Sequence, residues 1–566
     1  MKNQSTGFLA ISIVSSLILS SCGGIGKMAK NAETVKYEVT PSPLIVRGDS
    51  IELNINGSFP GKYFYKKASV DLTPTLMYGG NSTPFRVESF QGEDAVGNAT
   101  VIPYDAGKSF TYTDKIAYTP AMEKSELMLK TLAKKGKKEK EFEAYKLADG
   151  VITTPYLMMS DDKVIASKDN FQRVTQHTQY AVMNYLVNSS AVRESEFKKD
   201  DLKAMKAFIK DNGKKENISI KGLNVEAYAS PEGEISKNEN LAQERAESAA
   251  KFVSNEMKKN KMDAPEGFAN LVPKGEDWMG FKEKMMQSSV ADKELILRIL
   301  EMYTDLNKRE EEIRNLAATY IELKDKILPE LRRSQMTLNY EIVGKTDEVL
   351  KMMSKTNPDS LNAEELLFAS TLTTDLNEKL AIYKNSARMF PQDERGSNNV
   401  GYIYMLQNKL SEAEAEFQKS NGIKNNPQAS NNLGVVARLK GDRTKAMQMY
   451  KSATGAGAEV SYNMGIVNIQ NGDYSSAINN MVSMKSFNLA LAKVLNGDAE
   501  SASKTLAESA EKDSAKGNYL KAIIAARMND ASTVTTSLQA AYAADPSLRE
   551  KAAKDLEFRS FQEAIK

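Results

Sequence analysis

Apolar and polar residues alternate along the first third of the chain, and Gly and Pro residues separate the alternating runs. A period of two is typical of strands that bury one face, and Gly and Pro mark the turns between them. We therefore predict one or two antiparallel β-domains of the sandwich type over residues 36–165. The clearest runs are Ile51, Leu53 and Ile55; Val70 and Leu72; Phe110 and Tyr112; and Leu127 and Leu129.

A run of basic residues between Lys134 and Lys140 interrupts the strand pattern, which resumes at Phe142. Gly136 lies within this run and can adopt the backbone conformation of a tight turn. We interpret the run as the solvated tip of a hairpin. A contact between these lysines and an acidic lipid or polymer is the alternative.

Strand-like alternation and helical spacing succeed each other between residues 170 and 345. This order predicts an α+β domain with its helices on one face of a sheet. A further helical pattern over residues 277–331 predicts a helical insertion, in which Trp278 is either a core anchor or a platform for a sugar. The strand-like runs are residues 180–186, 218–227 and 336–342, and the helical ones lie around Met205 and after Asn238.

The C-terminal part of the chain, residues 346–566, repeats itself. Gly401, Gly434 and Gly465 recur at the same place in one helix, at intervals of 33 and 31 residues. Alanines recur in the partner helix. These intervals resemble the roughly 34-residue period of tetratricopeptide repeats, which implies an all-α solenoid with a concave groove for a protein partner. The alanines are Ala413, Ala446 and Ala477.

Asparagines also recur on the first helix of these repeats. They could line the groove and hydrogen-bond the backbone of a partner, because an amide side chain both donates and accepts. They could equally be solvated helix starts, and the sequence leaves both interpretations open. The residues are Asn398, Asn399, Asn431, Asn432 and Asn463.

The α+β domain carries a motif that resembles a known family. After the predicted second strand the chain reads Ala227-Tyr-Ala-Ser-Pro-Glu-Gly233, and the next helix carries Asn238 and Arg245. Together with the last strand after Leu331, these residues resemble the OmpA-like domain, a family that commonly binds peptidoglycan. The resemblance covers residues 170–345.

In OmpA-like domains an Asp and an Arg hold the zwitterionic diaminopimelate group of the peptide stem. The resemblance implies that Arg245 takes the ligand's carboxylate. Ser230 stands at the position of the Asp, so the anionic half of the clamp is missing, and Glu232 and Asn238 are nearby candidates. Peptidoglycan binding by these four residues is therefore a hypothesis. The alternative is that Arg245 pairs with an acid of its own helix, such as Glu244, or with the last strand.

The N-terminus resembles that of a bacterial lipoprotein. Lys2 precedes an apolar run that ends at Leu19, and two serines lead to Cys22, the single cysteine of the chain. These features describe a secretory signal peptide that is too short to be a comfortable membrane span. Leu19-Ser-Ser-Cys22 resembles a lipobox, which implies removal of residues 1–21 and lipidation of Cys22. An ordinary secreted protein is the alternative.

Residues 22–35 would then be a tether. The stretch directly after Cys22 contains no acidic residue. Surface-exported lipoproteins of the Bacteroidota type often have acids there, so the sequence favours the periplasmic side of the outer membrane. The whole chain resembles an envelope lipoprotein of that type, with an OmpA-like domain followed by tetratricopeptide repeats.

Composition narrows the chemistry further. The chain has 76 basic and 74 acidic residues and a formal net charge of +2, so no strong field attracts nucleic acid. His177 is the single histidine, which argues against a zinc site of the usual kind and a histidine-based catalytic group. We interpret His177 as structural or solvent-facing, and we predict no catalytic residue, metal or cofactor.

These observations predict a non-enzymatic outer-membrane lipoprotein that acts as a periplasmic scaffold, with a protein partner in the repeat groove and a possible contact with peptidoglycan. An assembly factor or chaperone for a fimbrial or secretion apparatus, without wall binding, is the first alternative. A hydrolase of cell wall or glycan is a minor one, because 74 acidic residues form carboxylate pairs by chance.

Overall fold

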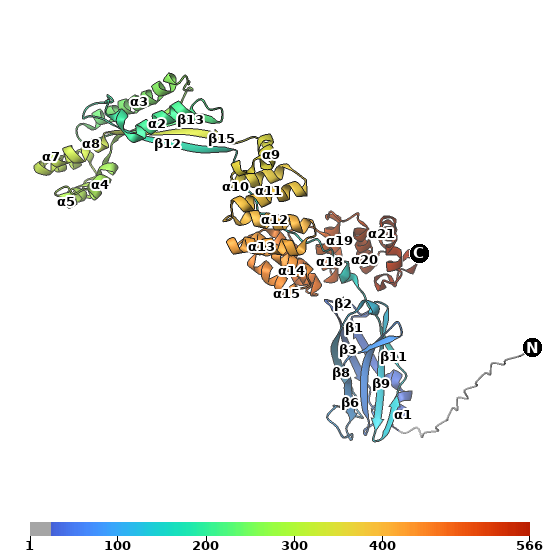
Figure 1. Ribbon diagram of the computed structural model, residues 1–566. Coiled ribbons are helices and arrows are strands. Elements are labelled where there is room, and N and C mark those ends of the chain that lie inside the picture. Colours follow the sequence, from blue (N-terminus) through green and yellow to red (C-terminus); the bar gives the residue numbers. More distant parts are fainter. Residues whose placement is uncertain (1–23, 566) are drawn as a thin grey trace, which may run out of the picture. The chain divides into compact units, whose positions relative to one another are not determined.

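A computed structural model describes residues 24–565 (Figure 1). The chain divides into two compact units. One unit is Met1–Ser167 together with Phe390–Lys566, and the other is Lys168–Met389. The first unit therefore joins two parts of the chain that are far apart in sequence.

The β-rich part of the first unit consists of two sheets, as the alternating pattern predicts. One sheet has the order β1-β3-β2, with β8 also paired to β3, and the other has the order β10-β9-β4-β6-β7, with β11 on β9 and β5 on β4. The alternating apolar residues that predicted these strands are buried, namely Ile51, Leu53 and Ile55 of β3 and Leu127 and Leu129 of β9. The strands are β1 (Lys36–Thr40), β2 (Val46–Arg47), β3 (Ser50–Phe59), β4 (Ser69–Tyr78), β5 (Asn81–Pro84), β6 (Glu88–Gly92), β7 (Thr100–Ile102), β8 (Lys108–Ala117), β9 (Ser125–Lys135), β10 (Lys138–Glu141) and β11 (Tyr145–Gly150).

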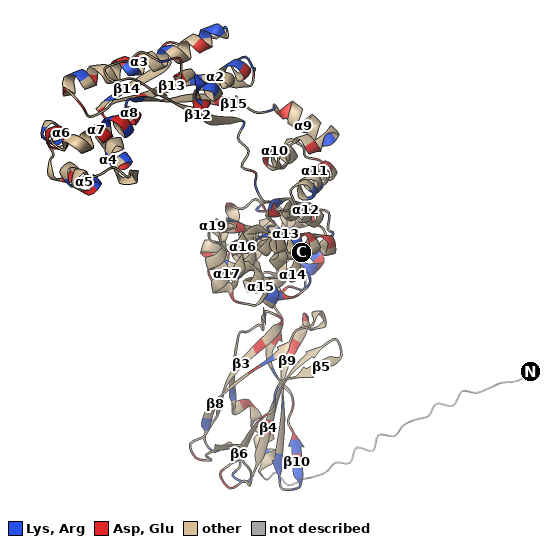
Figure 2. Ribbon diagram, turned by 60° about the vertical axis from the view of Figure 1, so that its left-hand side comes forward, with Lys and Arg blue, Asp and Glu red and all other residues tan. Residues whose placement is uncertain are grey.

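The basic run forms the predicted hairpin. Lys135 of β9 pairs with Lys138 of β10, and Gly136 lies in the turn with a φ of 56°. All four residues of β10, two lysines and two glutamates, are exposed, and Figure 2 shows blue lysine positions at this end of the sheet. The interpretation as a solvated hairpin tip is confirmed.

The predicted tether differs from the structure. Helix α1 (Ile25–Lys30) and a 3₁₀ turn (Ala32–Thr34) fall within residues 22–35. Ile25 and Met28 are three residues apart, share one face of α1, and are buried in the sandwich core beside Phe59 and Phe64. Burial of these two side chains makes residues 25–34 part of the sandwich, and Cys22 lies outside the described residues.

The middle domain is an α+β domain, as predicted. Its sheet has the order β12-β15-β13-β14, in which β13 and β14 are parallel and the other neighbours antiparallel. Helices α2 and α3 pack on one face of this sheet and share its core (Figure 1). The pairing of β13 with β15 shifts in register between Ile220 and Gly222. The elements are β12 (Val174–Asn184), α2 (Asp200–Asn212), β13 (Ile218–Ala229), α3 (Ile235–Lys259), β14 (Ala269–Glu276) and β15 (Arg333–Val343).

The predicted helical insertion lies between β14 and β15 and has its own core. Trp278 packs edge-on against Phe281 at 5.8 Å between ring centroids, and its Nε1 donates to Glu276 Oε2 at 2.8 Å. Arg309 lies over the indole ring. These contacts confirm Trp278 as a core anchor. The helices are α4 (Trp278–Gln287), α5 (Lys293–Met302), α6 (Leu306–Arg314), α7 (Ala317–Lys326) and α8 (Leu328–Leu331).

The first helices after the α+β domain belong to the same unit as that domain. Residues 168–173 lie against these helices: the Asn170 N–H donates to Glu364 Oε2 at 2.6 Å, and Phe171 stacks on Phe368 at 4.4 Å. The predicted boundary at residue 346 therefore does not coincide with the end of this unit. The unit continues to Met389 and includes the helices that contact residues 168–173. The helices are α9 (Asp347–Thr356), α10 (Ala363–Ala369) and α11 (Leu376–Met389).

Paired helices form the rest of the C-terminal part, at the predicted spacing. Gly401 and Gly434 face Phe417 and Tyr450 of their partner helices, where a Cβ atom would lie 2.6 and 2.4 Å from the ring. The recurring alanines are fully buried. The helices are α12 (Glu394–Leu406), α13 (Leu410–Ile423), α14 (Pro427–Leu439), α15 (Arg443–Ser452), α16 (Ala458–Gln470), α17 (Tyr474–Met481), α18 (Phe487–Leu495), α19 (Ala499–Ala507), α20 (Ala515–Arg527), α21 (Ala531–Ala544), α22 (Leu548–Ala552) and α23 (Gln562–Ile565).

The close approach of α14 and α15 leads to a testable prediction. Gly434→Ala is expected to lower the free energy of unfolding of the repeats by about 1–3 kcal/mol, because the added methyl overlaps the Tyr450 ring. Gly422→Ala, in the exposed part of α13 with nothing within 4 Å, is the control and is expected to stabilise by up to about 1 kcal/mol. Hydrogen exchange in α13 to α15 at increasing urea concentration measures both, and equal effects would contradict the packing role of Gly434.

Candidate functional site

The inner side of the repeats holds a segment of the same chain. Strand β11 ends at Gly150, and a 3₁₀ turn (Thr154–Leu157) follows. Residues 158–167, which we name the strap, then pass along helices α18, α16, α14 and α12 without helix or strand of their own. The predicted β-rich domain of residues 36–165 therefore ends earlier than expected.

Three asparagines bind the strap through its backbone. The side-chain amide of each accepts from the N–H and donates to the C=O of a single strap residue. The distances are 2.8 and 2.8 Å for Asn463 with Lys163, 2.8 and 2.8 Å for Asn432 with Ile165, and 2.7 and 2.9 Å for Asn399 with Ser167. Every second residue from Lys163 to Ser167 is bound, as in a strand that pairs along one edge. Contacts of this kind recognise an extended backbone rather than a sequence.

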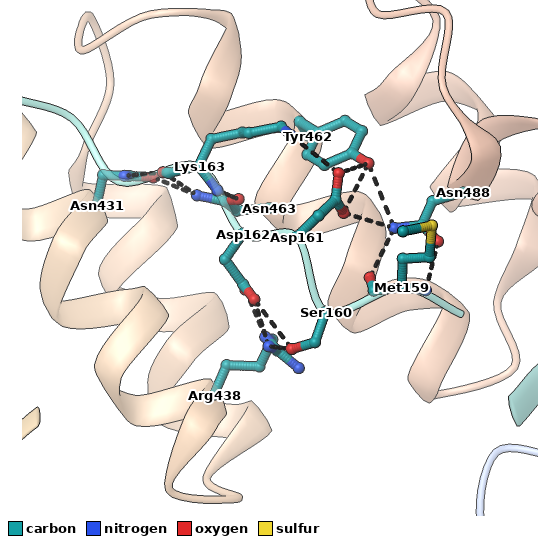
Figure 3. A network of polar contacts seen from close by, with 10 residues as sticks. All are labelled: Met159, Ser160, Asp161, Asp162, Lys163, Asn431, Arg438, Tyr462, Asn463 and Asn488. Atoms are coloured by element: carbon teal, nitrogen blue, oxygen red, sulfur yellow. Dashed lines mark hydrogen bonds and ion pairs between the residues drawn. The ribbon is translucent and has the colours of Figure 1, made fainter. Parts of the chain in front are cut away.

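A fourth asparagine continues the series on α18. Asn488 accepts from the Met159 N–H and donates to the Met159 C=O, both at 2.8 Å, and its Nδ2 also lies 2.8 Å from Asp161 Oδ1 (Figure 3). It lies two residues before Ala490, as Asn463 lies two residues before Gly465. The signal was present in the sequence, but the change from Gly to Ala hid it.

A second row of asparagines supports the first. Asn431 donates to the Lys163 C=O at 2.9 Å, and Asn398 donates to the Ile165 C=O at 3.1 Å. The two rows are linked, since Asn463 donates to Asn431 Oδ1 at 3.0 Å and Asn432 to Asn398 Oδ1 at 3.1 Å. We name this set the asparagine ladder. It consists of Asn398, Asn399, Asn431, Asn432, Asn463 and Asn488, and each is at most 1% exposed.

The ladder decides between the two interpretations of the recurring asparagines. They do not face solvent, and they do hydrogen-bond an extended backbone. The bound segment, however, belongs to the protein itself. Buried amides are costly when they lack partners, so the strap supplies hydrogen bonds that the ladder needs.

A buried ion pair fixes one strap side chain. Arg438 of α14 meets Asp162 with Nε on one carboxylate oxygen and Nη2 on the other, and Nη2 also contacts Ser160 Oγ (Figure 3). The Arg438 and Asp162 side chains are 4% and 5% exposed. A bidentate pair of this kind is specific for a carboxylate. It therefore adds side-chain specificity to the backbone contacts.

The neighbouring acid is bound as well. The Tyr462 hydroxyl lies 2.9 and 2.8 Å from the two oxygens of Asp161. Burial, together with the charge of Asp161, raises the pKa of Tyr462 far above its ordinary value, so the phenol stays a hydrogen-bond donor. Lys163 Nζ pairs with Asp161 at 2.9 Å and lies 4.9 Å from the centre of the Tyr462 ring. Two adjacent strap carboxylates, Asp161 and Asp162, are thus bound by side chains of two different helices, α16 and α14.

Apolar strap residues complete the contact. Val164 and Ile165 pack against a cluster of buried side chains from α14, α15 and α16, including Val435 and Tyr450. Met158, together with Leu157 of the 3₁₀ turn before the strap, packs against clusters of the later repeats. The strap is therefore held by backbone hydrogen bonds, one buried ion pair and apolar contacts at once.

Arg245, the predicted peptidoglycan ligand, is buried. Its guanidinium donates to the carbonyls of Leu186, Ser189 and Tyr228 at 3.1, 3.0 and 2.9 Å, and it lies over the Tyr185 ring. It is 1% exposed, and burial lowers its pKa to about 10. The alternative pairing with an acid of its own helix is not seen either. In this structure Arg245 joins the loop after β12 and strand β13 to its own helix, α3.

The other three predicted residues lie together, and two of them, Ser230 and Glu232, contact a different cation, Arg332. Glu232 Oε1 accepts from Arg332 Nη2 at 2.6 Å and from Ser230 Oγ at 2.7 Å. Asn238 Nδ2 donates to the Glu232 C=O at 3.2 Å and to Glu276 Oε1 at 2.8 Å. The sequence interpretation missed Arg332, because nothing in the motif distinguishes it from Arg333.

The helical insertion also reaches this loop. Glu310 of α6 accepts from the Gly233 N–H at 2.6 Å. The residues expected to meet a ligand therefore contact the protein's own insertion and last strand. The four positions form closed internal contacts rather than an open clamp.

Glu276 gives this region a pH dependence. Burial raises its pKa above the ordinary 4.5, despite hydrogen bonds from Asn238 and Trp278. Above pH 4.5 the folded protein then binds more protons than the unfolded chain, so this group makes the free energy of unfolding fall as pH rises. Glu276→Gln is expected to reduce that fall in urea titrations at several pH values. An unchanged pH profile would contradict it.

The single histidine lies in β12. His177 is exposed, its Nε2 lies 2.8 Å from Thr175 Oγ1, and its ring stacks on Tyr340. This agrees with the solvent-facing interpretation. Residues 24–565 contain no group of three or more metal-ligating side chains placed to hold a metal ion. None of the helices described is long and apolar enough to cross a membrane.

Comparisons with known proteins find similarity of fold in part of the chain. No protein-family model matches the sequence, and no curated protein matches it. Among solved structures, the APC/C hetero-tetramer Cut9–Hcn1 is 14% identical over 39% of this chain and 46% of its own, with a TM-score of 0.32. PilF of Pseudomonas aeruginosa is 13% identical over 39% and 99%, with a TM-score of 0.29.

A tetratricopeptide repeat protein from Parabacteroides merdae is 14% identical over 39% of this chain and 91% of its own, with a TM-score of 0.28. This chain thus spans less than half of the first of these structures and nearly all of the other two. Similarities at this level carry no inference about function.

Proposed function

We propose that the protein is a non-enzymatic scaffold of the bacterial envelope, anchored by a lipid on Cys22, that holds polypeptide segments in its helical repeats. The observation that carries this proposal is the asparagine ladder, which binds an extended backbone at every second residue from Lys163 to Ser167. Amide side chains in this arrangement bind and orient a chain, and they provide no nucleophile, acid or base for catalysis.

The lipid anchor is part of the proposal and rests on the sequence around Cys22. Cells that express the chain are grown with labelled fatty acid, and the label is expected on the native protein but not on Cys22→Ala. Cys22→Ala should also leave the membrane fraction after the signal peptide is removed. Absence of label on the native protein would remove the anchor from the proposal.

The location is proposed as the outer membrane, on the periplasmic side, because no acid follows Cys22 directly. Protease treatment of intact cells tests the side: protection is expected, with cleavage after the outer membrane is permeabilised. Cleavage in intact cells would place the protein on the surface instead.

Peptidoglycan binding stays a prediction from the OmpA-like resemblance. Because Arg245 is occupied by three carbonyls, we expect any contact with the wall to use other residues. Sedimentation of the native chain with purified peptidoglycan tests the prediction. If the protein stays in the supernatant, the scaffold acts without the wall.

A further inference from the structure

We propose that the asparagine ladder is a peptide-binding site whose resident ligand is the strap of the same chain, so that an external peptide binds only when the strap is out of place. That an external peptide is the partner rests on the proposed scaffold function. That the strap closes the site does not. The ligand class is an extended acidic segment with two adjacent carboxylates followed by aliphatic residues.

The strap has the features of a ligand rather than of a fold element. It has no helix or strand, and the contacts to its backbone come from side chains of four repeats. The ladder asparagines lie at equivalent positions in these repeats, so each repeat offers the same hydrogen-bonding groups to an extended backbone. An extended segment from another source would find the same donors and acceptors.

Two charges define which segment fits. Arg438 is buried against Asp162, and the Tyr462 hydroxyl is held by Asp161. A segment without an acid at the position of Asp162 would leave Arg438 buried and unpaired, which is strongly unfavourable. Val164 and Ile165 meet an apolar cluster two and three positions after Asp162. The required pattern is therefore two acids, any residue, and two aliphatic residues.

The strap competes for the site more effectively than a free peptide does. It is tethered to the repeats, so its effective concentration is on the order of millimolar or higher. The ladder residues are at most 1% exposed, so no second chain reaches them while the strap is bound. A free peptide at micromolar concentration is therefore expected to be excluded from the native protein.

The experiment uses the full chain and a fluorescent synthetic peptide of residues 156–168. Strap variant Asp162→Lys with Ile165→Lys changes the ligand and leaves the site unchanged. Fluorescence anisotropy is expected to show binding to the variant at least about tenfold tighter than to the native chain, because the tethered competitor is weakened. A peptide with Lys in place of Asp162 is the matched ligand control and should not bind the variant.

Two results would overturn the proposal: native chain and variant bind the peptide equally, or neither binds it. Circular dichroism establishes that the variant is folded. A second measurement needs no variant at all. In the native chain, hydrogen exchange at the Lys163, Ile165 and Ser167 amides should be slower than at Val164 and Ala166, and fast exchange at all five would also overturn it. Fatty-acid labelling of Cys22 is independent of these results.

Discussion

Arg438→Ala is expected to lower the free energy of unfolding of the repeats by about 3–5 kcal/mol, because it leaves the buried carboxylate of Asp162 without its partner. Asp162→Ala is expected to lower the free energy of unfolding by a similar amount, because it leaves the buried guanidinium of Arg438 without its partner. Because the chain has several domains, we do not expect it to unfold in one step. The transition should therefore be followed by hydrogen exchange in α14 and α16 at increasing urea concentration.

The exposed ion pair between Arg388 and Asp359 is the matched control, with both side chains more than half exposed. Arg388→Ala should change stability by about 1 kcal/mol or less. The double variant Arg438→Met with Asp162→Leu should recover most of the stability, since apolar residues of similar size fill the same space. If Arg438→Ala behaves like Arg388→Ala, the strap is not held by this pair.

Arg245→Met is expected to destabilise the α+β domain by about 3 kcal/mol or more, because three backbone carbonyls lose their donor and each unsatisfied group costs about 1–3 kcal/mol. Arg245→Lys should recover only part of this loss, since a single ammonium lacks the planar fork that reaches all three carbonyls. The measurement is the urea midpoint of this domain, followed by hydrogen exchange in α3.

Glu247→Ala, an exposed change on the same helix, is the control and should remain within about 0.5 kcal/mol of the native chain. A ligand-binding arginine would behave differently: Arg245→Met would then unfold like the native chain and lose only its sedimentation with peptidoglycan. These two patterns are distinguishable in one set of samples.

Regular local patterns predicted much of the fold. The alternation at Ile51, Leu53 and Ile55 predicted a strand with one buried face, and β3 has that face. The glycines and alanines of the repeats predicted close helix pairs, which α12 to α17 form. Strand β14 was missed, because Pro273 and Gly275 interrupt its apolar pattern and few of its residues are buried.

The residues of the site were predictable only in part. The spacing of Asn399, Asn432 and Asn463 marked them as equivalent, but spacing along a helix cannot tell a solvated side chain from one that meets a second segment. In the OmpA-like motif, Arg245 matched by position. Whether a matching arginine faces a ligand or closes a core depends on the chain around it, here on the carbonyls of Leu186 and Ser189.

By itself, the sequence determined the kinds of element, the repeat period and the residues that recur in it, because hydrophobic periodicity reports which face of a local segment is buried. Only the tertiary structure decided that residues 158–167 fill the inner side of helices α12 to α18, more than two hundred positions later in the chain. The physical reason is that an extended segment bound through its backbone needs no periodic side-chain pattern, so its partner appears only when the two segments are brought together.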